Sequence, residues 1–349
     1  MINTKQLTNV NIAAIGVYIP PFRVTTQEIA STYQKNAAQI SGSLGITQKS
    51  VADSDEDCLT MAVQASLQAF SNSNTDPQSI GAIFVGSESH PYAVKPTGTM
   101  VGEWLGINPD YFCADLQFAC KAGTAGLQIV AAMIESGIIN HGLVIGSDKA
   151  QSKPGDALEY SAASCAVAIL LSRKPGIAKL NATNSYSSDT PDFWRRQTTH
   201  YPEHGGRFTG EPAYFKHVIN GTQAFLDKYK HQISNFDHVV FHMPNGKFPK
   251  KAAKKLGVTR KQLQHGFTVN HIGNPYSSSS MLGLANTLAN AKKGEEILTT
   301  SYGSGSGSDT FHITMAKSVP IDIKKSIKKQ LTANIPVSYV QYLQMMKII

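Results

Sequence analysis

Asp115-Leu-Gln-Phe-Ala-Cys120-Lys-Ala-Gly-Thr-Ala-Gly126 joins an apolar strand pattern to a run of small residues with helical spacing. Cys120 is therefore expected at the N-terminus of a helix, and the glycines behind it allow another backbone to approach closely. A helix dipole stabilises an anion at its N-terminus, so we expect the pKa of Cys120 to be lowered. The stretch predicts a reactive cysteine where a strand meets a helix.

The surroundings of Cys120 recur in the second half of the chain, without a cysteine. Glu88 ends an apolar strand pattern 32 residues before Cys120, and His242 ends a similar pattern 32 residues before Asn274. The offset between the two pairs is 154 residues (242 minus 88, and 274 minus 120). The chain therefore reads as two copies of one unit, the first with Glu88 and Cys120 and the second with His242 and Asn274.

Other segments keep the same register. The apolar run 143–148 falls opposite 297–302, again at an offset of 154, and the helical pattern Ala122–Glu135 falls opposite 276–289. Solenoid repeats are about 20–50 residues long, so a period of this size indicates a duplicated α/β domain instead. We predict a first half at 1–175, an inserted substrate loop region at 176–213, and a second half at 214–349 that ends in a basic tail.

Composition favours a large cytoplasmic globular protein. The chain has 349 residues, of which 41% are hydrophobic, enough for a large core. No run approaches the roughly 20 apolar residues of a membrane span, and Met1-Ile-Asn-Thr-Lys-Gln-Leu-Thr lacks the apolar segment of a signal peptide. Four cysteines without framework spacing favour a reducing compartment. We expect no membrane association.

The chain is basic, with a net charge of +8. The cations do not form a stripe interleaved with aromatic residues and no nucleic-acid motif is visible, so we expect no nucleic-acid partner. The densest basic group follows His242 and comprises Lys247, Lys250, Lys251, Lys254, Lys255, Arg260 and Lys261. It is either a solvated helix face or, as we favour, the place where an anionic substrate meets the mouth of the site. The basic run 324–329 is expected to be plain surface.

A thiol, a carboxylate, an imidazole and an amide suit carbon–carbon bond formation on thioesters. The thiolate can accept an acyl group by exchange, and a nearby carboxylate can remove the acidified α-proton to give an enolate. Donors from His242, Asn274 and the backbone of 303–307 can stabilise the oxyanions. A cysteine protease would also pair Cys with His, but it needs neither the second carboxylate nor the duplicated architecture.

Each of these residues has a plain structural alternative. Cys120 could be an inert core thiol, Glu88 a loop carboxylate and His242 a buried structural histidine. Asn274 could be a turn former before Pro275. Their matched places in the repeat favour function in each case.

No metal or cofactor is expected. His200 and His204 have the i, i+4 spacing of a metal-binding pair, but no third ligand is apparent. Gly303-Ser-Gly-Ser-Gly-Ser308 lacks the Gly-x-Gly-x-x-Gly spacing of a dinucleotide loop. We predict instead a tight loop that closes on the thioester.

Several motifs together resemble one family. They are Gly86-Ser-Glu-Ser, Phe118-Ala-Cys-Lys-Ala-Gly-Thr-Ala, Pro154-Gly-Asp-Ala-Leu-Glu-Tyr160, Arg207-Phe-Thr-Gly-Glu-Pro-Ala-Tyr214, Phe241-His-Met-Pro-Asn-Gly-Lys247, Gly273-Asn-Pro-Tyr276 and Ser301-Tyr-Gly-Ser-Gly-Ser306. The chain resembles the 3-hydroxy-3-methylglutaryl-CoA synthases of the thiolase superfamily, in their shorter archaeal form, over roughly residues 10–345. The resemblance implies a duplicated five-layer αβαβα thiolase-like fold.

The resemblance also implies a reaction of the mevalonate pathway of isoprenoid synthesis. Cys120 would hold the acetyl group of acetyl-CoA, Glu88 would take a methyl proton from it, and His242 would polarise and protonate the ketone of acetoacetyl-CoA. The substrates are CoA thioesters and no cofactor is implied. The substrate-binding positions that match are Asn274 and Ser304 for the second acyl chain, Ser161 and Thr209 for the hydroxymethylglutaryl group, and Lys247 and Lys251 for CoA. Position 251 is expected to be arginine, and lysine loses its bidentate fork.

The partners implied are a second copy of the chain, in a homodimer, and an assembly with acetoacetyl-CoA thiolase and a small bridging protein. Three rival hypotheses stay open. A ketoacyl synthase III-like enzyme would need no carboxylate base, so Glu88 speaks against it. An acyl-carrier-protein-dependent β-branching enzyme could use the same basic residues near Lys247. A non-catalytic scaffold subunit is disfavoured because all four site residues are present.

Overall fold

The computed structural model describes residues 6–349, and its core is a nine-stranded sheet in the order β11-β12-β13-β8-β1-β7-β6-β4-β5. The strands are β1 (Asn11–Tyr18), β4 (Ala82–Gly86), β5 (Phe112–Leu116), β6 (His141–Lys149), β7 (Ser164–Ser172), β8 (Ala178–Ser187), β11 (His238–Phe241), β12 (Glu296–Thr300) and β13 (Gly307–Met315). Only two residue pairs, Asn11 with Lys179 and Ile12 with Ala178, join β1 to β8. The sheet is therefore two half-sheets with a narrow seam.

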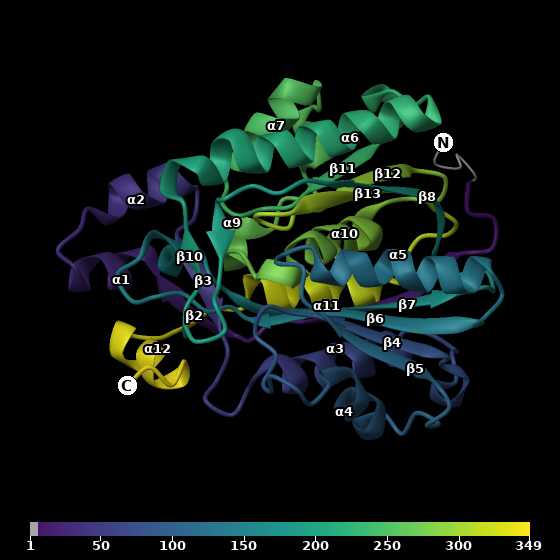
Figure 1. The fold of residues 1–349 in the computed structure, drawn as a ribbon, viewed down its shortest axis with the longest axis horizontal. Coiled ribbons are helices and arrows are strands. Elements are labelled where there is room, and N and C mark those ends of the chain that lie inside the picture. The colour runs from purple at the N-terminus through teal and green to yellow at the C-terminus, as the bar shows by residue number, and fades with distance from the viewer. Residues whose placement is uncertain (1–5) are drawn as a thin grey trace.

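Helices cover both half-sheets and fill the space between them. The main helices are α3 (Cys58–Ser71), α4 (Thr97–Trp104), α5 (Ala122–Glu135), α6 (Phe215–Tyr229), α7 (Phe248–Leu256), α8 (Arg260–Leu263), α9 (Val269–Ile272), α10 (Ser279–Asn290) and α11 (Ile321–Thr332). Figure 1 shows five layers, with α6 and α7 outside one half-sheet, α5 and α10 in the middle, and α3 and α4 outside the other. The predicted five-layer thiolase-like arrangement is confirmed.

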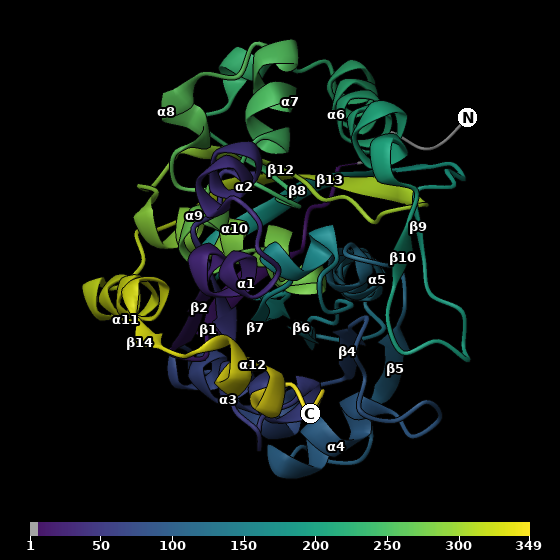
Figure 2. The ribbon, with the colours of Figure 1, turned by 90° about the vertical axis from the view of Figure 1, so that its left-hand side faces the viewer.

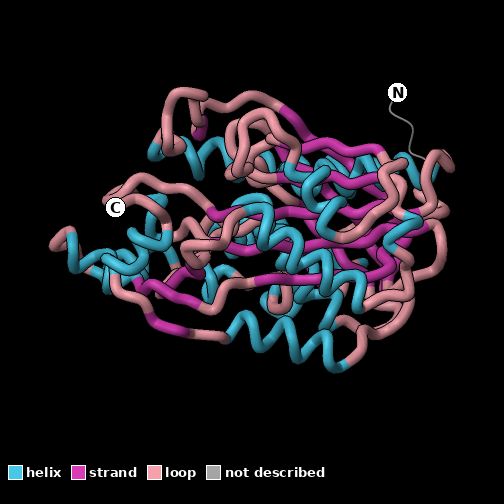
Figure 3. Tube along the Cα trace, turned by 90° about the horizontal axis from the view of Figure 1, so that it is seen from below, coloured by secondary structure: helices cyan, strands magenta, loops and turns pink. Residues whose placement is uncertain are grey.

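Small residues allow the central layer to pack tightly. A Cβ added to Gly123 of α5 would overlap the sulfur of Met281 on α10, and one added to Gly146 of β6 would lie 2.8 Å from that same sulfur. The two middle helices can approach each other and the strands because these positions carry no side chain. The strands run along the long axis of the molecule between the helices, as Figure 3 shows.

The two halves repeat one plan. In the first half β4 pairs in parallel with β6, and in the second half β11 pairs in parallel with β12. The predicted helix Ala122–Glu135 has the bounds of α5, whereas the predicted pattern 276–289 begins with a 3₁₀ turn, Tyr276–Ser278, and continues as α10. Only the first half has a further parallel strand, β5, beyond β4.

The region 176–213 differs from the sequence-based expectation of an inserted loop. Its first part is β8, which pairs along its length with β13 and belongs to the central sheet. Only the remainder leaves the sheet, as the short hairpin β9 (Phe193–Trp194) and β10 (Glu203–His204) and the helical turns Gly206–Thr209 and Gly210–Tyr214. Alternate residues of β8 are exposed or half-buried and polar, which gives it the composition of a loop.

The C-terminal segment packs onto the side of the molecule that carries α1 (Thr26–Thr32) and α2 (Ala37–Leu44). A small sheet of β14 (Ile335–Pro336), β2 (Phe22–Thr25) and β3 (Gln48–Val51) joins this segment to the first part of the chain. The last helix, α12 (Tyr339–Met345), contacts α1, and Figure 2 shows it below α1 and in front of α3. Within residues 6–349 no helix is both long and apolar enough to cross a bilayer.

Candidate active site

Cys120 lies in the turn between β5 and α5 and contacts Glu88. The Cys120 Sγ donates a hydrogen bond of 3.0 Å to Oε1 of Glu88, which follows the end of β4. Cys120 is 3% exposed, and Ala119 before it has a φ of +44°, in the left-handed region that residues with a Cβ rarely adopt. The strained turn aims the thiol at the carboxylate.

The expected lowering of the Cys120 pKa is wrong. Burial raises the pKa of the thiol well above its ordinary value, and the neighbouring Glu88 carboxylate raises it further. Cys120 does precede the first residue of α5, Ala122, but the helix dipole offsets only part of the effect of burial and a like charge. The resting form is therefore a thiol that donates its proton to Glu88.

The pKa of Glu88 is itself raised to about 8. Burial is the largest cause and the carboxylate of Asp148 the next, while the hydrogen bond from Cys120 and the charge of Arg195 act in the opposite direction. A carboxyl group that titrates near neutral pH can both accept and return a proton during turnover. This property suits Glu88 for general base chemistry.

Asp148, at the end of β6, is a site residue that the sequence analysis did not single out. It is fully buried, and its Oδ1 accepts hydrogen bonds from the Glu88 backbone N–H at 2.8 Å and the Ser87 hydroxyl at 2.8 Å. Its Oδ2 accepts from the backbone N–H of Ser277 at 2.8 Å, in the 3₁₀ turn before α10. Asp148 thus ties the Glu88 loop to the second half. Its place at the end of a strand parallel to β4 was the available signal.

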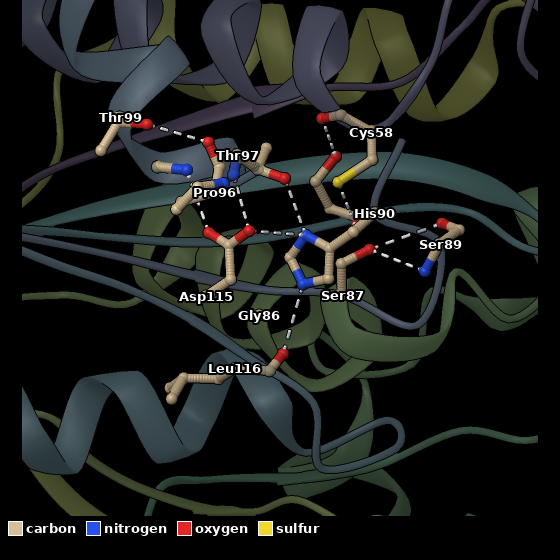
Figure 4. Close-up of polar contacts among 12 residues, drawn as sticks. Cys58, Gly86, Ser87, Ser89, His90, Pro96, Thr97, Thr99, Asp115 and Leu116 are labelled. Carbon is tan, nitrogen blue, oxygen red and sulfur yellow. Dashed lines mark hydrogen bonds and ion pairs between the residues drawn. The ribbon is translucent and has the colours of Figure 1, made fainter. Parts of the chain in front are cut away.

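His90 holds the other end of the Glu88 loop, as Figure 4 shows. Its Nδ1 lies 2.8 Å from the hydroxyl of Thr97 and 3.3 Å from Oδ2 of Asp115. Asp115 also accepts hydrogen bonds from the backbone N–H groups of Thr97 and Gly98, at the first turn of α4. The contacts of His90 are structural.

Asn274 and Ser161 lie side by side, and their sequence neighbours belong to the buried cluster that contains Cys120. The Asn274 N–H donates to the Ser161 carbonyl at 2.7 Å, and Asn274 Oδ1 accepts from the Tyr276 N–H at 3.1 Å. Tyr276 and Ala162, the neighbours of these two residues, pack with Cys120 in one buried cluster. The second half therefore supplies one wall of the thiol's surroundings.

His242 is fully buried at the end of β11. Burial lowers the pKa of the imidazole to about 3, so the ring is neutral. Neither ring nitrogen has a hydrogen-bond partner in the described part of the chain, residues 6–349. The ring packs 5.9 Å from that of Tyr302, which lies close enough to Cys120 for a thiolate there to raise the pKa of its hydroxyl further, after burial and Asp192. A buried imidazole without a partner is costly unless a substrate supplies one.

The loop that follows β12 packs against the nucleophile turn and carries Ser304, while its closure on a thioester stays a prediction. A Cβ on Gly303 would lie 2.6 Å from the Phe118 carbonyl oxygen and 2.9 Å from Cγ of Lys121. Before the loop, the hydroxyl of Tyr302 donates to Oδ2 of buried Asp192 at 2.7 Å. The inserted segment therefore anchors this loop, and the sequence analysis singled out neither Tyr302 nor Asp192.

Comparisons of the sequence with known proteins identify the family of the chain. Residues 6–175 match the profile described as hydroxymethylglutaryl-coenzyme A synthase N terminal, and residues 226–315 that of 3-oxoacyl-[acyl-carrier-protein] synthase III C terminal. A hydroxymethylglutaryl-CoA synthase of Archaeoglobus fulgidus is 52% identical over 310 residues, 89% of this chain and 90% of that protein. The chain belongs to the hydroxymethylglutaryl-CoA synthase family. The synthase of Methanococcus maripaludis is 46% identical over 342 residues, 97% of this chain and 98% of its own length.

Solved structures share the fold. A hydroxymethylglutaryl-CoA synthase crystallised with CoA has a TM-score of 0.89 at 24% identity, covering 97% of this chain and 90% of that one. A 3-oxoacyl-(acyl carrier protein) synthase III from Pseudomonas aeruginosa has a TM-score of 0.82 at 20% identity, covering 90% of this chain and all of that one. At 20% identity, the likeness to this second structure shows the fold alone.

A buried ion pair joins the nucleophile turn to the second half of this synthase-family chain. Lys121 Nζ lies 2.9 Å and 3.0 Å from the two carboxylate oxygens of Asp309 on β13. Asp309 also accepts from the hydroxyls of Thr124 at 3.0 Å and Ser185 at 2.8 Å. The residue after Cys120 is thus fixed to the second half of the chain.

The remaining predicted site residues lie further out. Thr209 donates its hydroxyl to the Gly206 carbonyl at 2.9 Å, in the turn after β10. Lys247 and Lys251 are exposed at the start of α7, one helical turn apart. No contact with Cys120 joins these three to the buried group, so their roles stay predictions.

The inserted hairpin uses one of the two histidines for a carboxylate contact. His204 Nε2 lies 3.0 Å from Oδ1 of Asp156. In the part of the chain that the structure describes, no group of three or more His, Cys, Asp or Glu side chains is arranged to hold a metal ion.

Proposed function

We propose that this chain condenses acetyl-CoA with acetoacetyl-CoA to give 3-hydroxy-3-methylglutaryl-CoA, through an acetyl group on Cys120, in the mevalonate pathway of isoprenoid synthesis. The observation that carries the proposal is the 3.0 Å hydrogen bond from Cys120 to a Glu88 carboxyl whose pKa is raised to about 8. A thiol paired with a base of this strength suits both thioester exchange and enolate formation.

The first step is acetyl transfer. As the Cys120 sulfur attacks the thioester carbon of acetyl-CoA, Glu88 Oε1 accepts the thiol proton along the existing hydrogen bond. The carbon–sulfur bond to CoA breaks, and the leaving thiolate takes the proton back from Glu88. Glu88 is then a carboxylate again beside an acetylated Cys120.

The second step is enolate formation. The Glu88 carboxylate removes one methyl proton from the acetyl group, and the electron pair moves to the thioester carbonyl. The buried surroundings strengthen the base, because burial and Asp148 disfavour its charged form. The Glu88 backbone N–H and the Ser87 hydroxyl donate hydrogen bonds to Asp148, and these bonds keep the Glu88 loop in place during this transfer.

The third step joins the carbons. The enolate carbon attacks the ketone carbon of acetoacetyl-CoA, and the neutral His242 imidazole donates its N–H to the ketone oxygen. The oxygen becomes the tertiary alcohol, and the proton that Glu88 removed restores the neutral His242 imidazole, so Glu88 ends the step as a carboxylate. Asn274, Ser304, Ser161 and Thr209 are proposed to hold the acyl chains.

Water then cleaves the Cys120 thioester, which frees the carboxylate end of the product and restores the thiol. Every step is an acyl transfer, a proton transfer or an addition, so the cycle balances without a redox cofactor or a metal. We therefore expect full activity after treatment with EDTA.

Lys247 and Lys251 are proposed to bind the phosphates of CoA. Lys247 directly precedes α7, and its backbone N–H donates to Asn245 Oδ1 at 2.9 Å. Both lysines are exposed, and the start of a helix favours anions. A hydroxymethylglutaryl-CoA synthase at 24% identity has been solved with CoA, and MvaS at 23% identity with 3-hydroxy-3-methylglutaryl coenzyme A, which supports CoA thioesters as substrates here.

The deciding experiment is intact-protein mass spectrometry with acetyl-CoA, followed by addition of acetoacetyl-CoA. The expected result is an acetyl adduct on Cys120 that is discharged to a six-carbon product. Discharge only by malonyl or carrier-protein thioesters would favour a rival condensing enzyme. The absence of an adduct with any acyl donor would favour the scaffold hypothesis.

The assembly of the chain is also part of the proposal. We infer a cytoplasmic homodimer that associates with acetoacetyl-CoA thiolase and a small bridging protein, as the resemblance implies. Purification of the tagged chain from its native cells should recover both partners. A preparation that never contains thiolase would contradict the assembly and leave the condensation reaction intact.

A further inference from the structure

The motif at 154–160 contains a fully buried carboxylate, Glu159, that has no role in the proposed condensation. Its Oε2 accepts a hydrogen bond of 2.7 Å from the Gly155 backbone N–H, and its Oε1 accepts one of 2.8 Å from the hydroxyl of Tyr339 on α12. Figure 1 shows α12 at the outer edge of the molecule, apart from the central helices α5 and α10. A peripheral helix therefore contacts the segment that leads directly into Ser161.

Lys49 of β3 joins the same segment to α12. It is 1% exposed, and its Nζ donates hydrogen bonds to the backbone carbonyl of Glu159 and to the hydroxyl of Tyr342, the latter at 3.0 Å. Burial lowers the pKa of Lys49 to about 7, and the Glu159 carboxylate acts in the opposite direction. Burying an ammonium group costs more free energy than burying an apolar side chain of the same size, so stability alone does not account for this lysine. A buried polar network favours one arrangement of the segments that it joins.

The residues on either side of this lysine in β3 also contact two separate segments. The Gln48 side-chain amide donates to the His271 carbonyl at 3.2 Å. The Ser50 hydroxyl oxygen lies 2.7 Å from the Ser164 carbonyl oxygen and 3.3 Å from that of Ile272. Three successive residues of β3 therefore hold the segment that ends at 272 and the segment that spans 159–164.

Ser161 and Asn274 meet where these two segments come together. The Asn274 N–H donates to the Ser161 carbonyl at 2.7 Å, and the Ala163 N–H donates to the Asn274 carbonyl at 3.0 Å. Gly273 has a φ of +81°, and a Cβ there would lie 2.5 Å from the Ser161 carbonyl oxygen and 3.0 Å from Cβ of Lys49. Lys49 thus packs directly against the junction, and a change in its position would move both site residues.

The far end of α12 is fixed by a second lysine. Lys149 Nζ donates to the backbone carbonyls of Asp53 at 2.8 Å, Glu56 at 2.9 Å and Met345 at 2.8 Å. All three protons of the ammonium group therefore have acceptors. With both of its ends bonded to the body of the molecule, α12 can hold its tyrosines against Lys49.

We propose that Lys49 is a positioning residue for acetoacetyl-CoA, and that Glu159 and the tyrosines of α12 hold it in place. Lys49 acts on the substrate only through Ser161 and Asn274, so the inference rests on their part in the proposed condensation. Acetyl transfer to Cys120 needs neither of these two residues, and it should not depend on Lys49. The C-terminal helix thereby supports the site of the second substrate.

The test compares the steady-state kinetics of Lys49→Met and Tyr342→Phe with those of the wild type. Lys49→Met keeps the length of the side chain but removes the ammonium group, so KM for acetoacetyl-CoA should rise about tenfold. Acetylation of Cys120 by acetyl-CoA should stay within about twofold of the wild-type rate. Tyr342→Phe removes only the hydroxyl that accepts from Lys49 and should raise the same KM about threefold. The matched control is Tyr229→Phe on α6, which loses a 3.0 Å hydrogen bond to the Thr183 carbonyl and should change KM by less than about twofold.

Amide hydrogen exchange gives a readout that does not depend on catalysis. In Lys49→Met, the Asn274 N–H should exchange about tenfold faster than in the wild type, because the segment that carries its acceptor is no longer held. Tyr229→Phe should leave this exchange rate unchanged. A lower melting temperature with unchanged KM and unchanged exchange would make the network purely structural and overturn the proposal.

The remaining outcomes separate this proposal from the proposed function. An equal rise of KM in Tyr229→Phe, or a slowing of Cys120 acetylation in Lys49→Met as large as the effect on KM, would overturn the proposal in favour of a general loosening of the fold. A wild-type chain that forms no product from acetoacetyl-CoA would refute the condensation itself. A wild-type chain that forms product, with an unchanged KM in Lys49→Met, would refute only the positioning role.

Discussion

The two halves of the molecule share one architecture but shift the pKa values of their site residues in opposite directions. The first half contributes Cys120 and Glu88, joined by a hydrogen bond, with the pKa of both raised. The second half contributes His242, whose pKa is lowered to about 3 and whose ring has no partner within residues 6–349. Burial causes both shifts, because it disfavours the charged form of an acid and of a base alike. In the first half, a proton donor, Cys120, already contacts a proton acceptor, Glu88, before substrate binds. In the second half, we expect a substrate oxygen to become the hydrogen-bond partner of His242.

The substitution with the largest expected effect removes the nucleophile, Cys120. Cys120→Ala should lower product formation by at least about 10⁴-fold, because no other group can carry the acetyl intermediate. Intact mass after incubation with acetyl-CoA measures the adduct. Cys113→Ala, which removes a half-buried thiol on β5, should leave the adduct unchanged. An acetyl adduct that persists in Cys120→Ala would contradict the assignment.

The next test separates the two tasks within the first half. Glu88→Ala should still form the acetyl adduct, but condensation should fall by about 10³-fold because the base for the methyl proton is gone. Rapid-quench measurement of adduct and product distinguishes the two steps. The exposed Glu103 provides a control substitution to alanine. Equal condensation rates in the wild type and Glu88→Ala would end the enolate hypothesis.

The third test asks whether His242 belongs to a later step. His242→Gln should lower condensation by about 10²-fold. Exchange of the acetyl methyl protons with D₂O, measured without acetoacetyl-CoA, should continue in this variant because Glu88 alone performs it. If His242→Gln stops exchange as completely as Glu88→Ala does, the halves do not divide the chemistry in this way.

A smaller effect is expected at the outer surface of the second half. Lys247→Ala with Lys251→Ala should raise KM for the CoA thioesters by about tenfold and leave kcat nearly unchanged, because phosphate contacts are the same in ground and transition states. Lys251→Arg should lower KM by a few-fold, since arginine restores a bidentate contact. Steady-state kinetics would show it, with Lys255→Ala as the control. A fall in kcat alone would contradict the binding role.

The smallest effect concerns the pH profile. The pKa of Glu88 is raised to about 8, so kcat/KM should rise with pH as the carboxylate ionises around that value. Arg195 lowers the pKa of Glu88, so Arg195→Gln should move the rise to higher pH, by a few tenths of a unit because the side chain is exposed and screened. Arg196→Gln next to it should have no such effect. A shift to lower pH would contradict this electrostatic account.

The strongest sequence predictions came from spacing. The shared offset of 154 residues correctly brought Glu88 to Cys120 and placed His242 and Asn274 at matching elements of the second half. The bounds of α5 followed from its run of small and apolar residues, which only a helix in the middle layer of the molecule can accommodate. When a pattern repeats within one chain, the residues assigned in one copy can be checked against the matching positions of the other copy.

The failures came from effects that depend on distant residues. The dipole argument for Cys120 considered its own helix and missed the burial and the like charge of Glu88. The strand β8 has half-exposed, polar residues at alternate positions, and its partner β13 lies more than 100 residues further on. The sequence did not predict Asp148 as a site residue, because an aspartate at the end of a strand is common. Its five hydrogen bonds in the structure identify it.

The buried pair of Lys121 and Asp309 bears on how such a duplicated chain can evolve. Once each half held one member of the pair beside the nucleophile, loss of either member left a buried charge, which costs about 3–5 kcal/mol. Viable changes at these positions must arrive together. The pair therefore makes the two halves depend on each other. Surface residues of either half can change, but neither half can become an independent domain without leaving its member of the pair as an unpaired buried charge.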